Sequence, residues 1–281
     1  MTAPTVTAPA PSCGLSGQLG LDELRGASLA EVDAAAALQH RVDRKYLIPT
    51  ATARRLVAEL ADTHHVLDLG GRRTTGYLST YFDTPGLGAW RAHVQGRRHR
   101  WKVRTRLYAE DQLCRVEVKT KDGRGATVKH ALTATAKDYG RLGAEASAFV
   151  DTVLAASGLP GVTAAGLDPA GEVTYVRAAL ADLDAGTRIT LDGRLACHRA
   201  GRSALLDPQY VLVETKGAVR PAPADRILTS LGARPVSISK YIVGLSLLVP
   251  GLPDNSVRHL ARTRFHLIST VPGQAERNSA A

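Results

Sequence analysis

The sequence predicts an α+β protein of antiparallel strands with helices packed outside, and one of the two arrangements that its strands allow is a β-barrel of about eight strands with a basic interior. Three observations support this fold class. Several segments alternate charged and apolar residues with the period of two that is typical of a strand. Glycine-containing junctions separate neighbouring segments, as they do in a meander of adjacent strands. Segments with a helical spacing of apolar residues lie before, between and after the strands.

The first half of the chain begins with helical spacing and continues mainly as strands. We expect a helix at 21–39, a strand at 41–49, a helix at 50–61, and strands at 74–83, 97–108, 112–121 and 125–134. Pro49 ends the first strand, and Thr50 or Thr52 caps the helix that follows. An Asp-Thr-Pro-Gly turn signal ends the strand at 74–83.

The second half of the chain repeats this mixture. We expect a helix at 137–157, strands at 172–183, 187–195 and 209–217, and helices at 222–233 and from Lys240 onward. Residues 1–20, rich in Pro, Thr and Ala, are predicted to be a disordered lead-in. Because no linker signal interrupts residues 21–248, we expect them to form one domain, followed by a tail at 249–281 that is partly ordered at best.

Composition restricts the class of protein and of partner. The chain has 281 residues, of which 44% are hydrophobic, enough to bury a substantial core. A formal charge of +10 indicates an anionic partner. The three cysteines, Cys13, Cys114 and Cys197, lack metal-site spacing, which favours a reduced cytoplasmic setting. No targeting segment is evident.

The most informative segment is the strand at 97–108. One of its faces is basic at every position, with Arg98, Arg100, Lys102, Arg104 and Arg106, whereas the other carries Trp101, Val103, Thr105 and Leu107. Later strands also have a charged face, formed by Arg115, Glu117, Lys119 and Lys121, by Tyr175 and Arg177, by Arg188, Thr190 and Asp192, and by Glu214 and Lys216.

Two interpretations of these charged faces remain open. In the first, the strands are half-buried and turn their polar side to water. In the second, the charged faces line the interior of a closed barrel. Rows of like charge are destabilising unless an anion binds among them, and Arg and Lys suit a ligand with many phosphate oxygens. Glu117 and Glu214 could then hold a divalent metal, because hard cations prefer oxygen ligands.

Nine segments occur in an order that resembles the VTC catalytic domain, the polyphosphate polymerase module of the vacuolar transporter chaperone complex, also found in bacteria. They are DRKYLI, TYFDTP, WRAHVQGRRHRWKVRTRLY, RVEVKTK, VKHALT, VTYVRAAL, TRITLDGRL, LVETKG and SISKYIVGL. The resemblance runs from about Val42 to Leu248. It implies the triphosphate tunnel fold of the CYTH-like superfamily of triphosphate tunnel metalloenzymes, an eight-stranded antiparallel tunnel.

The resemblance also implies roles for individual residues. The residues expected to act on the reacting phosphates are Arg104, Arg106, Lys119, Arg177 and Arg188. Further phosphate-binding residues would be Lys45, Arg91, Lys129, Ser239 and Lys240, and the strand pattern adds Lys102, Lys121 and Lys216. Glu214 would be the metal ligand, with Mn²⁺ or Mg²⁺ as the cofactor, and the strand pattern adds Glu117.

The activity implied is transfer of the ATP γ-phosphate to a growing polyphosphate chain. A tunnel triphosphatase with water as acceptor, and a non-catalytic polyphosphate-binding subunit, remain alternatives. The Glu-x-Glu-x-Lys signature of hydrolytic relatives is absent, which disfavours a two-metal hydrolytic site. A nucleic-acid partner is disfavoured because aromatics are only 5% of the chain.

We expect a cytoplasmic protein. Neither the regulatory SPX domain nor the membrane helices of eukaryotic subunits are found in the sequence. An association with the inner face of the membrane through a membrane-protein partner subunit is left open, and so is the oligomeric state.

Overall fold

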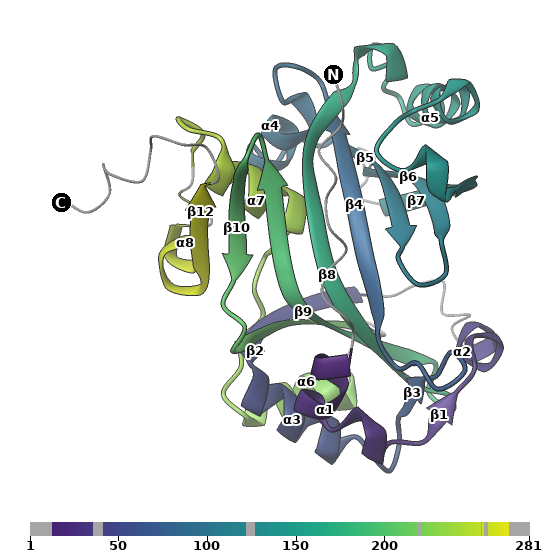
Figure 1. Cartoon of the computed structure of the whole chain (residues 1–281), viewed down its shortest axis with the longest axis vertical. Helices are drawn as coiled ribbons and strands as arrows, with labels where there is room; N and C mark the ends of the chain where they lie inside the picture. Colours follow the sequence, from purple (N-terminus) through teal and green to yellow (C-terminus); the bar gives the residue numbers. More distant parts are fainter. Residues whose placement is uncertain are drawn as a thin grey trace. The chain divides into compact units, whose positions relative to one another are not determined.

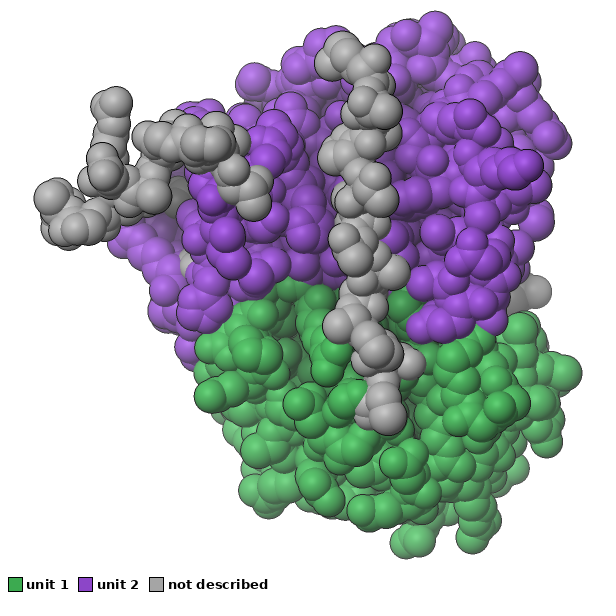
Figure 2. Space-filling model, viewed as in Figure 1, with its two compact units in different colours: residues 1–76, 175–195, 206–238 green, residues 77–174, 196–205, 239–281 purple. Residues whose placement is uncertain are grey.

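The computed structural model describes residues 13–35, 42–121, 127–217, 221–253, 255 and 258–269 (Figure 1). The chain divides into two compact units, each assembled from interleaved segments (Figure 2). Unit 1 comprises 1–76, 175–195 and 206–238, and unit 2 comprises 77–174, 196–205 and 239–281. No single cut in the chain separates the units, because each combines segments from distant parts of the sequence.

Unit 1 contains most of the N-terminal elements and parts of three strands shared with unit 2. Its helices are α1 (Cys13–Leu19), η1 (Leu21–Glu23), α2 (Leu29–Ala35), α3 (Thr50–Glu59) and α6 (Pro223–Ser230). Its strands are β1 (Gly26–Ala27), β2 (Val42–Pro49), β3 (His65–Leu67), β11 (Tyr210–Gly217) and parts of β4 (Thr75–Asp83), β8 (Asp168–Asp182) and β9 (Thr187–Arg199). β11 pairs antiparallel with both β2 and β9, while β3 pairs antiparallel with β8 and parallel with β1.

Unit 2 contains the meander expected from the sequence. Its helices are α4 (Gly88–Val94), η2 (Ala136–Asp138), α5 (Ala144–Ala156), η3 (Ala164–Gly166), α7 (Lys240–Leu248) and α8 (Arg258–Arg264). β5 (Arg100–Tyr108), β6 (Leu113–Lys121) and β7 (Thr127–Thr135) follow one another, and β10 (Arg202–Leu206) and β12 (Phe265–Ser269) complete the strands. The hydrogen-bonded order is β12-β10-β9-β8-β4-β5-β6-β7.

The predicted α+β class and the antiparallel sheet are confirmed. Twelve strands are described, but β1, β3, β10 and β12 have only two to five residues, so eight longer strands carry the architecture. The pairings among the described residues do not close into a ring, since β7 pairs with β6 and with no second described strand.

Several predicted boundaries are wrong. The segment predicted as a disordered lead-in contains α1, because Leu15 and Leu19 are buried in the core of unit 1; residues 1–12 lie outside the described residues. The helix predicted at 21–39 is split into η1, β1 and α2. β5 begins at Arg100, so Arg98 does not belong to the strand. Within the predicted tail, 258–269 form α8 and β12.

Helices cover the apolar face of the strands in each unit, as predicted. In unit 1, α1, α3 and α6 lie together against β2, β9 and β11 (Figure 1), and their Leu19, Leu56 and Leu228 are fully buried. In unit 2, α5 packs Val150 and Leu154 against the apolar side of β5 and β6. Each fully buried side chain of this kind contributes about 1.5–3 kcal/mol. Among the described helices, none is both long enough and apolar enough to cross a membrane.

A buried carboxylate ties α6 to the strands of unit 1. Asp225 is 3% exposed. Its Oδ1 accepts hydrogen bonds from the Tyr46 hydroxyl (2.9 Å) and the Thr215 hydroxyl (2.7 Å). Its Oδ2 accepts from the Ala222 amide (2.9 Å) and from Arg44 Nη1 (3.3 Å). A buried carboxylate is costly unless it is paired and hydrogen-bonded, and these four donors satisfy it.

We predict that Asp225→Ala lowers the free energy of unfolding by about 3–5 kcal/mol, because it removes the buried acceptor of the Tyr46 and Thr215 hydroxyls and a negative charge beside Arg44. Urea denaturation followed by circular dichroism measures this loss. The matched control is Glu59→Ala, on the exposed side of α3, which should change stability by less than about 0.5 kcal/mol. Equal stability of the two variants would contradict the assigned role of Asp225.

Candidate functional site

Strands β4 to β7 of unit 2 form a sheet with one apolar and one basic face. We call the side chains of the second face the basic face: Tyr81, Lys102, Arg104, Arg106, Arg115, Glu117, Lys119 and Lys129. In β5 the alternation is direct, because Trp101, Val103 and Thr105 are buried while Lys102 and Arg104 are half-buried. The predicted two-faced strand is confirmed over this segment.

Arginines and the carboxylate of Glu117 lie at the centre of the basic face. The register places Glu117 directly opposite Arg104 on β5. Arg104 donates to Glu117 Oε2 from Nε (2.6 Å) and also contacts it through Nη2 (2.5 Å). Arg106 Nη1 lies 3.7 Å from the same oxygen, and Lys129 contacts Oε1. Burial alone would raise the pKa of Glu117, but these three cations together lower it well below its usual range.

Next to this cluster lies a row of three lysines. Lys119 pairs with Lys102 on β5 and with Lys129 on β7, so the three lie opposite one another on adjacent strands. Lys102 Nζ donates to Ser239 Oγ (3.0 Å). Lys119 is exposed, and within the described residues no ion pair involves it.

His93 on α4 lies within reach of the same positive charge. Burial, and then the charges of Lys102 and Arg100, lower the pKa of His93 to about 3.

Tyr81 is buried at the edge of the arginine cluster. Its hydroxyl accepts a hydrogen bond from Arg104 Nη1 (2.7 Å), and its ring stacks on Tyr241 with centroids 4.7 Å apart. Burial raises the pKa of Tyr81, but the charges of Arg104, Arg106 and Lys240 outweigh it and lower the pKa below its ordinary value. The phenol therefore reports the positive potential at the centre of the basic face.

Asp83 places α7 beside this sheet. Its Oδ1 accepts from the amides of Thr84 (2.7 Å) and Ala89 (2.8 Å). Its Oδ2 accepts from the Trp90 amide (3.0 Å) and from the Tyr241 hydroxyl. Asp83 thus connects the end of β4, the start of α4 and the start of α7. Ser239 and Lys240 directly precede Tyr241, so the same contact holds them near Lys102 and Tyr81.

Unit 1 has a charged face of its own, which we call the unit 1 face: Lys45, Arg177, Arg188, Asp192, Glu214 and Lys216. Glu214 on β11 lies between Lys45 on β2 and Thr190 on β9. Lys216 Nζ lies 3.5 Å from Glu214 Oε1, and Lys45 Nζ donates to the Ile238 carbonyl (2.9 Å). Arg188 contacts the Val32 carbonyl and donates to Asp33 Oδ1 (2.9 Å) on α2.

Arg177 is already paired on the unit 1 face. Its Nε and Nη2 donate to the two oxygens of Asp192 at 2.6 and 2.8 Å. Asp192 is fully buried, and the Arg177 guanidinium lies over the ring of Tyr175 at 5.2 Å. This bidentate pair orients the guanidinium and offsets its positive charge.

The carboxylates differ in how well they could hold a metal. In the part of the chain that the structure describes, no three His, Cys, Asp or Glu side chains gather as a metal-ion site would require. The metal role predicted for Glu117 has no support in these contacts, because Arg104, Arg106 and Lys129 already lie against its carboxylate. Glu214 has a side chain 14% exposed and fits as one carboxylate ligand of an ion whose other ligands are phosphate oxygens and water.

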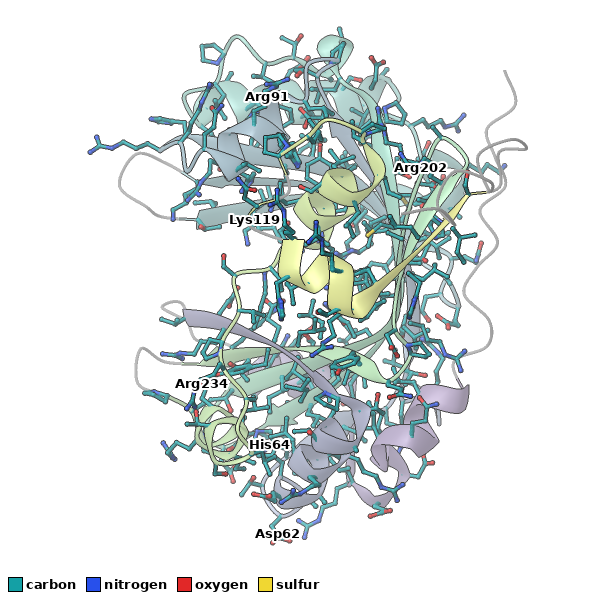
Figure 3. All side chains as sticks on the ribbon, turned by 90° about the vertical axis from the view of Figure 1, so that its left-hand side faces the viewer. Asp62, His64, Arg91, Lys119, Arg202 and Arg234 are labelled. Carbon is teal, nitrogen blue, oxygen red and sulfur yellow. The ribbon has the colours of Figure 1, made fainter. Side chains whose placement is uncertain are left out.

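The structure brings most of the predicted site residues onto the two faces. Lys121 also lies on the side of the basic face, opposite Arg100. Arg91 is the exception: it is exposed on α4, its Nε donates to the Gly86 carbonyl (2.8 Å), and Figure 3 shows it apart from Lys119. The phosphate-binding role predicted for Arg91 is therefore not supported.

Sequence reasoning missed three contributors to the site. The strand pattern at 74–83 assigns no role to Tyr81, whose hydroxyl contacts Arg104. The turn signal predicts only a turn at Asp83, which also accepts a hydrogen bond from Tyr241. His93 showed no signal at all. The Tyr-Phe-Asp-Thr-Pro segment contains the first two of these residues, and their alternation along β4 could have suggested that both point away from the apolar core.

One comparison with known proteins shows the family of this chain. A family model of the VTC domain matches residues 40–249. No curated protein matches the chain. Among solved structures the chain is similar to a putative adenylate cyclase from Bacillus halodurans, with a TM-score of 0.46 and 15% identity over 71% of this chain and 94% of that one. It is also similar to a putative adenylyl cyclase from Hippeastrum, described as having a dominant triphosphatase activity, with a TM-score of 0.46 and 19% identity over 75% of this chain and 98% of that one.

We predict that Arg104→Gln raises the pKa of Tyr81, because it removes both a nearby positive charge and a hydrogen-bond donor. Ultraviolet difference titration measures the phenol, and Tyr81→Phe identifies its part of the signal. The control is Arg141→Gln, an exposed arginine of unit 2, which should leave the titration unchanged. An unshifted Tyr81 in Arg104→Gln would contradict the contact.

Proposed function

We propose, since this chain belongs to the VTC domain family, that it is a metal-dependent polyphosphate polymerase. In this proposal its substrates are ATP and inorganic polyphosphate, and the γ-phosphate of ATP is transferred to the end of the growing chain. The observation that carries the proposal is the basic face of unit 2. The register there places lysines and arginines of neighbouring strands opposite one another, and Glu117 is the single carboxylate of β5, β6 and β7.

The electrostatics of the basic face support a polyanionic ligand. Paired residues on neighbouring strands lie about 5 Å apart, at which distance like charges repel by roughly 1–3 kcal/mol near a protein surface. The Lys102–Lys119–Lys129 row contains two such pairs. The Nε donors of Arg100 and Arg115 are buried without an acceptor among the described residues. The face therefore has more positive charge and more donors than its own acceptors can satisfy, and phosphate oxygens would supply the difference.

The residue types suit phosphoryl transfer. This reaction requires positioning and charge stabilisation, with little covalent chemistry from the protein. In the proposal, Arg104 and Arg106 orient the reacting phosphates through planar, directional donors, while the lysine row binds the chain through point charges. A terminal phosphate oxygen is already ionised and needs no strong general base. Ser239 and Lys240 add donors at the start of α7.

The carboxylate that we propose as a metal ligand lies on the unit 1 face. Glu214 is the residue that we propose as the protein ligand of Mn²⁺ or Mg²⁺, held in place between Lys45 and Thr190. Such an ion, when bound, neutralises negative charge on phosphate oxygens. Arg177, Arg188 and Lys216 are proposed to bind phosphates on the same face, with Asp192 orienting Arg177.

We predict that Arg104→Ala and Glu214→Gln each lower turnover by about 10²-fold or more, since each removes a group that stabilises transferring charge. The assay incubates purified protein with ATP and Mn²⁺, with and without a short polyphosphate primer, and resolves products on a polyphosphate gel. The control is Lys137→Ala, an exposed lysine on η2, which should retain full turnover.

The products decide among the candidate functions. A ladder of lengthening chains that both variants lose supports the polymerase. Free phosphate without a ladder would instead identify a triphosphatase. Tight polyphosphate binding with neither product would identify a non-catalytic binding subunit. Wild-type rates in both variants would contradict the residue assignment.

We predict that Lys119→Ala weakens binding of inorganic polyphosphate roughly three- to tenfold at low salt, by removing one exposed cation from the lysine row. It should also reduce the slope of log affinity against log salt by about one, because fewer counterions are exchanged. Titration calorimetry at several salt concentrations measures both quantities. Identical slopes for Lys119→Ala and the control Lys137→Ala would rule out a polyanion contact at Lys119.

A further inference from the structure

Glu117 carries a negative charge on the basic face, where the proposed ligand, polyphosphate, is also negatively charged. It is the only acidic residue in β5, β6 and β7, which together contain eight lysines and arginines. Its neighbours across the sheet are Arg104 and Ala131. It is 2% exposed. A carboxylate buried this deeply is unfavourable unless cations compensate for its lost hydration.

The compensation comes from three cations that the sheet brings together. Arg104 approaches Oε2 through two nitrogens, at 2.6 and 2.5 Å, while Arg106 lies 3.7 Å away and Lys129 contacts Oε1. With two of its nitrogens on Glu117, Arg104 directs Nη1 to the Tyr81 hydroxyl at 2.7 Å. The carboxylate therefore determines where the guanidinium lies and which edge it presents.

Glu117 also determines how much charge the cluster offers. Three cations and one carboxylate leave a net charge of +2, whereas without Glu117 the same cations would offer +3. Lys129 has a side chain 47% exposed, so the cluster remains open to solvent on the β7 side. An anion that approaches there is attracted by the cations and repelled by the carboxylate.

We propose that Glu117 is a positioning residue and a built-in counter-anion of the basic face. It orients Arg104 and Lys129 toward bound phosphates, and it lowers the affinity of the face for polyanions so that the phosphate chain binds without being trapped. This inference rests on the proposed function, because it assigns Glu117 a part in the binding and release of the same ligand.

The proposal predicts opposite effects of one substitution on polyanion affinity and on turnover. Replacing Glu117 with the neutral, nearly isosteric glutamine removes the repulsion but also releases Arg104 and Lys129 from their defined positions. Polyanions should then bind more tightly while phosphoryl transfer becomes slower. A residue that only maintained the fold would weaken both together.

The test measures inorganic tripolyphosphate binding by titration calorimetry, without ATP or metal, alongside chain elongation on the gel. For Glu117→Gln we expect binding at least about fivefold tighter and turnover at least about tenfold lower. The control is Glu145→Gln, in the exposed first turn of α5, which changes net charge equally and should alter neither quantity. Unchanged or weaker binding by folded Glu117→Gln would overturn the proposal.

A second variant decides the matter if Glu117→Gln does not fold. Glu117→Asp keeps the charge but shortens the side chain, so that it cannot reach Arg104 and Lys129 at once. We expect its affinity to stay within about twofold of wild type and its turnover to fall. Wild-type turnover would overturn the positioning role.

The two proposals fail in different ways. If wild-type protein binds tripolyphosphate but elongates nothing, the polymerase is refuted, and the affinities of Glu117→Gln and wild type still decide the counter-anion. If wild-type protein elongates chains and Glu117→Gln binds no more tightly, the counter-anion alone is refuted. If wild-type protein does not bind tripolyphosphate, both proposals fall.

Discussion

Repulsion among closely spaced cations is the constraint on which both charged faces depend. A sheet places paired side chains about 5 Å apart, and here many of these pairs are Arg or Lys. Apolar packing on the opposite face of the strands offsets this repulsion. Helix α5 covers the apolar side of β5 and β6, and α1, α3 and α6 cover that of β2, β9 and β11. The apolar cores hold the strands in a register that their charged side chains alone would disfavour.

Buried carboxylates then distribute the charge. Glu117 contacts Arg104, Arg106 and Lys129, whereas both oxygens of Asp192 accept hydrogen bonds from Arg177. Asp225 belongs to the apolar side of unit 1, where it anchors α6 with the help of Arg44. All three carboxylates are almost completely buried. A carboxylate shared among several cations leaves them positively charged overall, which is the condition for binding an anion.

The C-terminal part of unit 2 completes the basic face through one buried hydrogen bond. The Tyr241 hydroxyl reaches Asp83, which also caps the first turn of α4. Ser239 and Lys240 are thereby placed near residues about 140 to 160 positions earlier in the chain, Lys102 and Tyr81. The stacked rings of Tyr81 and Tyr241 reinforce the same junction. The free energy that positions Ser239 and Lys240 therefore comes from packing and capping around Asp83 and Tyr241.

Local pattern determined much of this protein. The period of two along β5 and β6 assigned their basic side chains to one face, because side chains alternate along a strand. The order of the motifs along the chain indicated the VTC domain family. Register and distance between remote segments could not be read in this way. Only the tertiary structure showed that Glu117 already has three cations, that Arg91 lies apart on α4, that α1 is buried, and that Asp83 holds Tyr241. An ion pair is selected by which strands meet and at what offset, and no single stretch of sequence contains that information.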